Sequence, residues 1–149
     1  MTDDTLAVEL SATGLSAAGL SATELSAIEE AAKKSGVLWL DLDRPRLAWH
    51  AWHDGAIHLV TGGEEQELPG LAGRESVRVT LRSKDNGARL VVFDAAVSVV
   101  EQAAAPEAVA ALAKERLNAR DSERLTERWA QGSTVLRLTP TGAARSTGV

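Results

Sequence analysis

The sequence predicts a mainly β protein with peripheral helices, an α+β fold in which six antiparallel strands form one small barrel. Two turn sequences carry this prediction, Asp54-Gly55 and Asn86-Gly87, and each stands between two runs rich in β-branched and aliphatic residues. Two-residue hairpin turns need positive φ at their central residues, which Asp-Gly and Asn-Gly accept. Six strands joined by short hairpins leave no unpaired edge when the sheet closes on itself.

The composition indicates one soluble domain and excludes several classes of protein. The 149 residues suffice for a single hydrophobic core, and the formal net charge of −5 argues against binding to nucleic acid or to an anionic membrane. The chain has no cysteine, so disulfides, thiolate nucleophiles and cysteine-ligated zinc are excluded. The N-terminus lacks the basic and apolar regions of a secretory signal, and we expect a cytoplasmic protein without a membrane-spanning segment.

The chain divides into an arm, a barrel domain and a tail. Leucine recurs at every fifth position from Leu10 to Leu25, and a step of five residues turns about 140° on an α-helix, so these leucines would not share one face. We therefore expect residues 1–20 to form a flexible arm; the alternative is an arm that lays its leucines across a partner subunit. The barrel domain is expected over residues 21–140, and residues 141–149 are expected to be disordered.

The domain begins with a helix and a strand. Ser21 and Glu24 have the spacing of a capping box, which predicts a helix that starts near Thr23 and ends at Gly36. Residues 37–42 are almost continuously apolar and predict the first strand. The Arg-Pro-Arg sequence that follows is expected to break this strand before the hairpin.

The hairpin around Asp54-Gly55 spans residues 46–61 and contains all three histidines and two of the four tryptophans. Counting outward from the turn pairs His53 with Ala56, and the same register places Trp49 opposite Val60. The side chains then alternate between two faces. One face holds Ala48, His50, Trp52, Ile57, Leu59 and Thr61, and the other holds Trp49, Ala51, His53, Ala56, His58 and Val60.

The histidines suggest a metal site, but the register argues against one. His50 lies on one face, whereas His53 and His58 are diagonal neighbours on the other. A zinc site needs three or four ligands, and no cysteine is present to complete the set. Two alternatives remain: the pair of histidines lines a ligand pocket, or all three are ordinary strand residues.

A loop and a second hairpin follow. Residues 61–71 are rich in glycine and glutamate and predict a loop with one helical turn near its end. The Asn-Gly turn then joins a strand over residues 76–82 to an unusually long strand over residues 88–101, and its register pairs Leu81 with Val92. A strand of that length usually bends around a barrel or belongs to two regions of a sheet.

Two helices and a strand complete the domain. Proline opens a helix over residues 106–119, whose apolar stripe includes Arg116. Arg116 either extends its charge past the edge of the core or contacts an anion or a partner. A second helix is expected over residues 121–131, followed by a last strand over residues 134–139.

The order of these elements resembles the split-barrel superfamily of flavin-binding proteins, which includes pyridoxamine 5′-phosphate oxidase and the flavin- or deazaflavin-dependent oxidoreductases. The resemblance covers roughly residues 25–140. It rests on the opening helix, the hairpin RPRLAWHAWHDGAIHLVTGG with its following loop, the hairpin SVRVTLRSKDNGARLVVFDAAVSVVE, and the late helix before the closing strand. It implies a six-stranded antiparallel split β-barrel and a homodimer that holds FMN or a deazaflavin at the subunit interface.

Seven residues are candidates for cofactor binding under this resemblance. The flavin phosphate would meet hydroxyls and basic side chains, and Thr61 at the end of its strand matches the family's hydroxyl. The chain carries acidic residues after Thr61 where the family carries basic ones, so Arg82, Ser83 and Lys84 are the candidate phosphate contacts. A tryptophan of the hairpin would stack on the isoalloxazine ring. The candidates are His50, Trp52, Thr61, Gly62, Arg82, Ser83 and Lys84.

The implied function is binding of a flavin or deazaflavin nucleotide, and the cofactor would carry any hydride or electron chemistry of an oxidoreductase. No Ser-His-Asp arrangement, paired carboxylates or phosphate-binding glycine loop argues for another kind of active site. The alternative is a cofactor-free split-barrel module for binding or interaction, which the acidic GGEEQE segment favours. A histidine-ligated haem or metal protein is a third interpretation.

Overall fold

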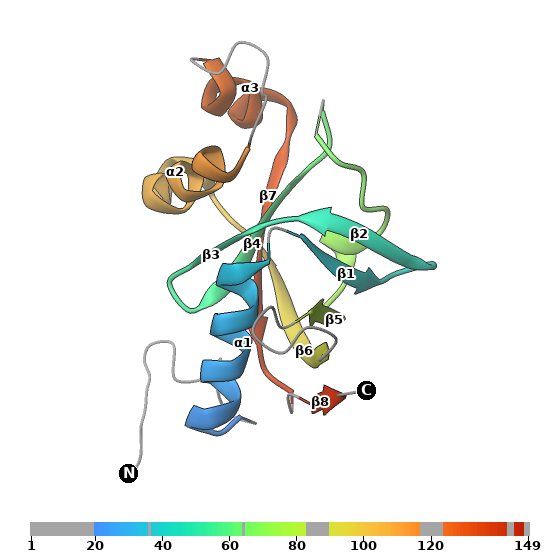
Figure 1. The fold of residues 1–149 in the computed structure, drawn as a ribbon. Coiled ribbons are helices and arrows are strands. Elements are labelled where there is room, and N and C mark those ends of the chain that lie inside the picture. The colour runs from blue at the N-terminus through green and yellow to red at the C-terminus, as the bar shows by residue number, and fades with distance from the viewer. Residues whose placement is uncertain are drawn as a thin grey trace.

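The computed structural model describes residues 20–35, 37–63, 65–82, 90–116, 124–142 and 145–147. Within these ranges one sheet carries three α-helices on its faces (Figure 1). The helices are α1 (Ala22–Lys34), α2 (Pro106–Glu115) and α3 (Leu125–Gly132), with short 3-10 turns η2 (Leu71–Gly73) and η3 (Gln102–Ala104). The strands are β1 (Val37–Asp41), β2 (Pro45–Trp49), β3 (Ala51–His53), β4 (Ala56–Thr61), β5 (Ser76–Arg82), β6 (Leu90–Val99), β7 (Thr134–Pro140) and β8 (Arg145–Thr147).

The sheet curls into an antiparallel half-barrel. Its hydrogen-bonding order is β2-β1-β5-β6-β7-β4-β3, and β8 pairs with β6 beside this path. The strands β2 and β3 therefore stand at opposite ends of the order, although only His50 separates them along the chain. The curl of the sheet brings its two ends together at this residue.

The α+β class is confirmed, but the predicted number of six strands is too small for the residues that the structure describes. The strand expected over residues 46–53 is divided at His50 into β2 and β3. The first strand ends at Asp41, before the Arg-Pro-Arg sequence as predicted, but this sequence does not lie outside the strands, because Pro45 opens β2, which pairs along β1. In the expected disordered tail, Arg145–Thr147 form β8.

The Asp-Gly hairpin has the predicted tip and a different base. Asp54 has φ +53 and Gly55 has φ +76, and β3 pairs with β4 in the expected register from His53 opposite Ala56. Beyond Ala51 this register ends, because the next strand, β2, turns away to pair with β1. The strand β4 pairs on its other side with β7.

The second hairpin is confirmed with its register displaced by one residue. Leu81 lies opposite Val91 rather than Val92. The Asn86-Gly87 turn itself lies outside the described residues. The long strand β6 pairs with β5 along its first part and with β7 along its last part, so it belongs to two regions of the sheet, as its length predicts.

A main core fills the concave side of the sheet, and α1 packs across it. Ser21 caps this helix as predicted: its hydroxyl accepts from the N–H of Glu24, and the carboxylate of Glu24 accepts from the N–H of Ser21. Residues 1–19 of the expected arm lie outside the described part, and Leu20 packs partly buried against the core. Core residues include Ile28, Leu38, Leu40, Ile57, Leu59, Leu71, Val79, Leu81, Phe93, Leu136 and Leu138.

A second core lies on the outer side of β4 and β7, where α2 and α3 pack together (Figure 1). Its residues come from alternate positions of the strands whose other positions face the main core, which confirms the two faces predicted for the hairpin. None of the described helices is long and apolar enough to cross a membrane. The second core consists of Ala51, Val60, Val109, Leu112, Leu125, Trp129 and Val135.

Candidate functional site

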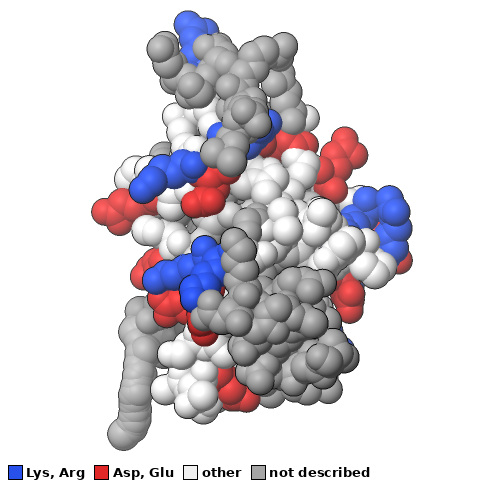
Figure 2. Space-filling model, viewed as in Figure 1, with Lys and Arg blue, Asp and Glu red and all other residues white. Residues whose placement is uncertain are grey.

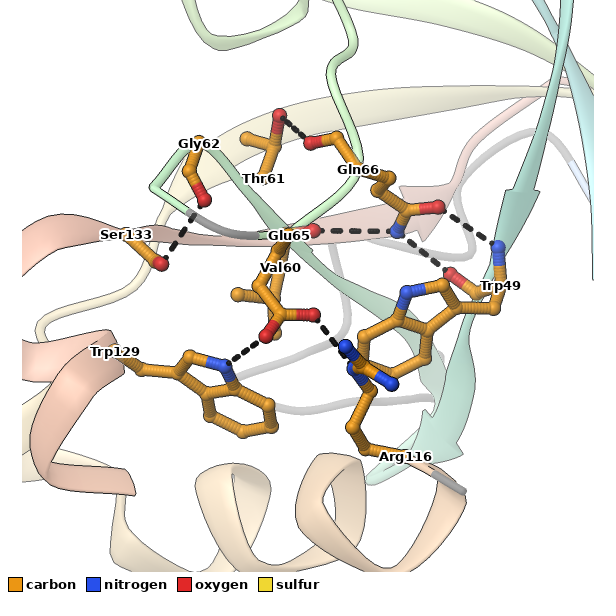
Figure 3. A network of polar contacts seen from close by, with 9 residues as sticks. All are labelled: Trp49, Val60, Thr61, Gly62, Glu65, Gln66, Arg116, Trp129 and Ser133. Carbon is orange, nitrogen blue, oxygen red and sulfur yellow. Dashed lines mark hydrogen bonds and ion pairs between the residues drawn. The ribbon is translucent and has the colours of Figure 1, made fainter. Parts of the chain in front are cut away.

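The loop after β4 folds back against the base of the hairpin and is held by the side chain of Gln66 (Figure 3). Its amide oxygen accepts from the N–H of Trp49 at 3.0 Å, and its amide nitrogen donates to the carbonyls of Trp49 at 3.0 Å and Val60 at 3.2 Å. Trp49 and Val60 are the two residues that a continued hairpin would have paired. The Gln66 side chain therefore fills the gap where β2 and β4 separate.

Thr61 and Gly62 are part of the same loop. The Thr61 hydroxyl donates to the carbonyl of Gln66 at 2.9 Å and accepts from the N–H of Leu68 at 3.2 Å. Gly62 has φ +87, and its carbonyl accepts from the hydroxyl of Ser133 at 3.1 Å. These groups are used to shape the loop, so the hydroxyl that was expected at a flavin phosphate is already engaged within the chain.

Glu65 turns its carboxylate into the molecule (Figure 3). One oxygen accepts from Nε of Arg116 at 2.8 Å and the other from Nε1 of Trp129 at 2.9 Å, and only 2% of the Glu65 side chain is exposed. The ring of Trp129 lies 6.3 Å from that of Trp49. Arg116 thus contacts an anion, as one of its two predicted roles requires, but the anion belongs to this chain.

The role of Glu65 was missed by reasoning from sequence, which placed it among charges that repel a phosphate. Two signals pointed to it: an arginine within an apolar helical stripe, and a tryptophan whose indole N–H needs an acceptor once buried. Both partners are distant in the chain, since Arg116 is 51 residues and Trp129 64 residues from Glu65.

His50 lies at the end of α1 and forms one wall of a pocket of about 320 Å³. Its Nε2 is 2.9 Å from the carbonyl of Ala32, and because a carbonyl only accepts, Nε2 carries the proton. In the described part of the chain no partner reaches Nδ1, although only 2% of the residue is exposed. Burial lowers the pKa of His50 below its usual value. The same pocket is lined by Trp52, Lys33, Lys34 and Glu115.

The other two histidines line a second pocket of about 300 Å³ on the outer side of the hairpin. The rings of His53 and His58 are 5.6 Å apart, edge to face. Burial lowers the pKa of His58 to about 4, and the positive charge of Arg137 adds to this effect. Among the described residues no group of three metal-ligating side chains occurs.

The predicted site residues do not form one site. His50 and Trp52 share the first pocket, whereas Thr61 and Gly62 belong to the loop network. Arg82 ends β5, on a strand that pairs with β1 and β6. The remaining two candidates, Ser83 and Lys84, lie outside the described residues.

Comparison with known proteins gives structural neighbours only. Neither a protein-family model nor a curated protein sequence matches this chain. The heme storage protein HutZ from Vibrio cholerae aligns over 79% of this chain and 90% of its own, with 16% identity and a TM-score of 0.55. A Listeria innocua protein provisionally named a pyridoxamine 5′-phosphate oxidase aligns over 84% and 98%, with 17% identity and a TM-score of 0.56. A general stress FMN/FAD binding protein from Xanthomonas citri aligns over 84% and 89%, with 15% identity and a TM-score of 0.54.

These neighbours are split-barrel proteins of the pyridoxamine 5′-phosphate oxidase type, and the predicted resemblance is confirmed for the fold. Their names refer to FMN or FAD, to pyridoxamine 5′-phosphate oxidation and to heme. At 15–17% identity the likeness establishes the fold and leaves the ligand to be argued from the residues of this chain.

Proposed function

We propose that this chain is a split-barrel protein that binds a flavin-type nucleotide, FMN or a deazaflavin, in the pocket beside His50 and Trp52. The observation that carries this proposal is the buried imidazole of His50, whose Nδ1 accepts no hydrogen bond from the described residues and forms part of a pocket wall. A buried acceptor without a donor is costly, and the N–H of a heterocyclic ring would satisfy it. Trp52 lines the same pocket and offers a ring for stacking.

Two lysines at the rim provide cations for a phosphate. Lys33 and Lys34 line the pocket, and their side chains are 58% and 44% exposed. Each makes an ion pair with a glutamate one turn earlier on α1, and exposed pairs of this kind contribute little to stability. Lys33 can therefore turn toward a ligand phosphate at small cost. Thr61 does not fit this role, because its hydroxyl already has two partners in the loop.

When bound, the flavin would supply hydride or electron transfer, so an oxidoreductase activity needs no acid or base from the chain. The residues of the pocket would hold the ring and the phosphate. The pocket of about 320 Å³ is at the small end of the range for cofactor sites, which suits a ligand that is shared with a second subunit.

A homodimer completes the proposal. Three large apolar side chains, Val37, Trp39 and Leu47, are 45–51% exposed on one face of β1 and β2, and Trp39 lies directly opposite Leu47. The surface over this hairpin is largely uncharged in Figure 2, with basic side chains at its tip. A second copy of the chain would bury this strip.

A titration monitored by absorbance and flavin fluorescence tests the proposal. Separate samples of the full-length protein receive FMN, riboflavin, a deazaflavin nucleotide and haemin. We expect micromolar binding of FMN or the deazaflavin, and about tenfold weaker binding of FMN to the double variant Lys33→Glu and Lys34→Glu, with riboflavin binding unchanged. Lys114→Glu, at an exposed position of α2, is the matched control.

The second candidate is a cofactor-free module for binding or interaction. The loop after β4 favours it, because Thr61, Glu65 and Gln66 all direct their polar groups to other parts of the chain. Failure of both FMN and the deazaflavin to bind at micromolar concentration would exclude the flavin proposal and leave this one. A Soret shift with haemin alone would instead favour a haem protein.

A further inference from the structure

The second pocket combines several features that attract anions, and it is separate from the pocket proposed for the flavin. It lies between the tip of the β3–β4 hairpin and the first turn of α2, and its volume is about 300 Å³. One wall is apolar, from Val100 and small residues at the start of α2. The polar side chains of the pocket are His53, Asp54, His58, Glu107 and Arg137.

The first turn of α2 lines this pocket. Ala105 is the N-cap residue and provides no side-chain hydrogen bond, and Pro106 is the first helical residue. The N–H groups of the next two residues, Glu107 and Ala108, precede the first intrahelical bond, which Val109 donates to Ala105. The N–H groups of a first helical turn and the positive end of the helix dipole favour an anion at this position.

His58 is an independent sign that a ligand belongs here. Only 2% of the residue is exposed, yet within the described structure its Nδ1 has no hydrogen-bond partner. The imidazole lines the pocket together with the start of α2. Its pKa is lowered to about 4, so it is neutral at pH 7, and with the proton on Nδ1 it donates one hydrogen bond to a ligand that accepts.

Arg137 lies beside a carboxylate of the chain in this region, that of Asp54. Its Nε donates to the hydroxyl of Thr139 at 3.0 Å, and its Nη2 donates to the backbone carbonyl of Asp54 at 3.0 Å. Its Nη1 lies 3.6 Å from the carboxylate of Asp54, whose side chain is 69% exposed. This distance is too long for a hydrogen bond, so a ligand carboxylate can replace Asp54 at Nη1 at small cost.

We propose that this pocket binds a small monocarboxylate with an apolar body. The carboxylate would lie between Arg137, His58 and the first-turn N–H groups of α2, and the apolar body would contact Val100 and Pro106. A single negative charge fits better than a phosphate dianion, because Asp54 and Glu107 add two negative charges at the rim. The guanidinium fork of arginine also matches the planar geometry of a carboxylate.

Benzoate is a suitable probe, and its neutral analogue benzamide is the control ligand. We expect benzoate to shift the NMR signals of the His58 ring and to raise the pKa of that imidazole, because a bound anion favours the imidazolium form. Benzamide should have at least tenfold weaker affinity. Equal binding of the two ligands, or a His58 signal that does not respond to benzoate, would overturn the proposal, and so would tighter binding of inorganic phosphate.

Two variants with opposite expected effects separate binding from misfolding. Asp54→Asn removes the competing carboxylate and keeps a residue that accepts positive φ, so benzoate should bind severalfold more tightly. Arg137→Gln should weaken benzoate binding at least tenfold, whereas Arg78→Gln, which breaks an exposed ion pair with Asp94 on the outer side of β5, should have no effect. Unchanged or weaker binding in the folded Asp54→Asn variant would contradict the assignment.

Discussion

The side chain of Gln66 makes both hydrogen bonds to the backbone of Trp49 that a neighbouring strand would make. Its amide accepts from the N–H and donates to the carbonyl of the same residue, each at 3.0 Å. β2 leaves β4 at this point to pair with β1, and the amide satisfies the backbone groups that the separation exposes. Gln66 therefore fixes the position at which the barrel splits.

Gln66→Glu should destabilise the protein by about 2–4 kcal/mol. The carboxylate keeps the bond from the N–H of Trp49 but cannot donate to the carbonyls of Trp49 and Val60, which it would repel. Denaturant unfolding measures the loss, and hydrogen exchange should show lower protection of the Trp49 amide. Gln131→Glu makes the same exchange on the exposed side of α3 and should cost less than about 1 kcal/mol.

Arg116→Ala should cost about 2–3 kcal/mol, because it leaves the buried carboxylate of Glu65 without its cation. The side chain of Arg116 is 28% exposed, which limits the loss relative to a fully buried pair. Arg78→Ala removes an exposed ion pair, 49% and 47% exposed, and should cost under about 0.5 kcal/mol. Equal losses in the two variants, measured by chemical unfolding, would mean that the ion pair with Glu65 contributes no more than a surface pair.

Stability should fall between pH 6.5 and pH 4 because of His58. Its pKa is about 4 in the folded chain and 6.5 when unfolded, so the unfolded state binds the proton first as the pH falls. The stabilisation is complete above pH 6.5, and about 3 kcal/mol is lost by pH 4. The lowered pKa of His50 acts in the same direction. In the His58→Gln variant, the free energy of unfolding should decrease less between pH 7 and pH 4 than in the wild type. An equal decrease in both proteins would show that His58 is not its source.

Acidification below this range involves Asp43 instead. The side-chain hydrogen bond from Arg46 lowers the pKa of Asp43 to about 2, so its contribution is present above pH 3.8 and is lost as the pH falls toward 2. The pH ranges of His58 and Asp43 do not overlap, so the contribution of His58 to the free energy of unfolding can be measured separately.

Gly63→Ala should destabilise the protein by about 3 kcal/mol. Gly63 has φ +64, and an added Cβ would lie 2.8 Å from the hydroxyl of Ser133 and 2.9 Å from the backbone carbonyl of Gly132. Gly70→Ala is the matched control, because Gly70 has φ +80 but open space around the new Cβ. It should cost about 1 kcal/mol, from backbone strain alone. A thermal melt of both variants would show whether the contact with α3 adds to the strain.

Trp39→Ser and Leu47→Ser should weaken self-association at least tenfold, as measured by sedimentation velocity over a range of concentrations. Both residues are about half exposed and face the same side of the β1–β2 hairpin. Val99→Ser removes another exposed apolar side chain, 62% exposed, from β6 and serves as the control. A wild-type protein that stays monomeric at high concentration would exclude this surface as a dimer interface.

Local signals predicted the elements that depend on nearby residues. The capping box of Ser21 and Glu24, the positive φ of Asp54 and the alternation of residues 76–82 each involve groups a few positions apart. The pairing beyond Ala51 could not be predicted from such signals. The Trp49 N–H and carbonyl, which a longer hairpin would pair with Val60, bond instead to the side chain of Gln66, which lies 17 residues away.

The candidate site shows the same limit. His50 and Trp52 were predicted individually and share a pocket, because the alternation of a strand places them on one face. The contact between Glu65 and Arg116 joins a loop to the end of a helix, and the spacing of residues in the sequence contains no information on that distance. The charge of Glu65 was therefore counted among the acidic residues that disfavour a phosphate, although it is buried and paired with Arg116.

His50 links β2 to β3, the two end strands of the sheet, and this link bears on association through strand edges. The two end strands of the sheet are held together by one backbone residue and not by a ladder of hydrogen bonds between them. A circular permutant with new termini at His50 would keep every strand pair but could uncurl. Its end strands would then present unpaired N–H and C=O groups to other molecules, as aggregation-prone edge strands do. The linkage at His50 thus keeps the two end strands of the sheet adjacent to each other.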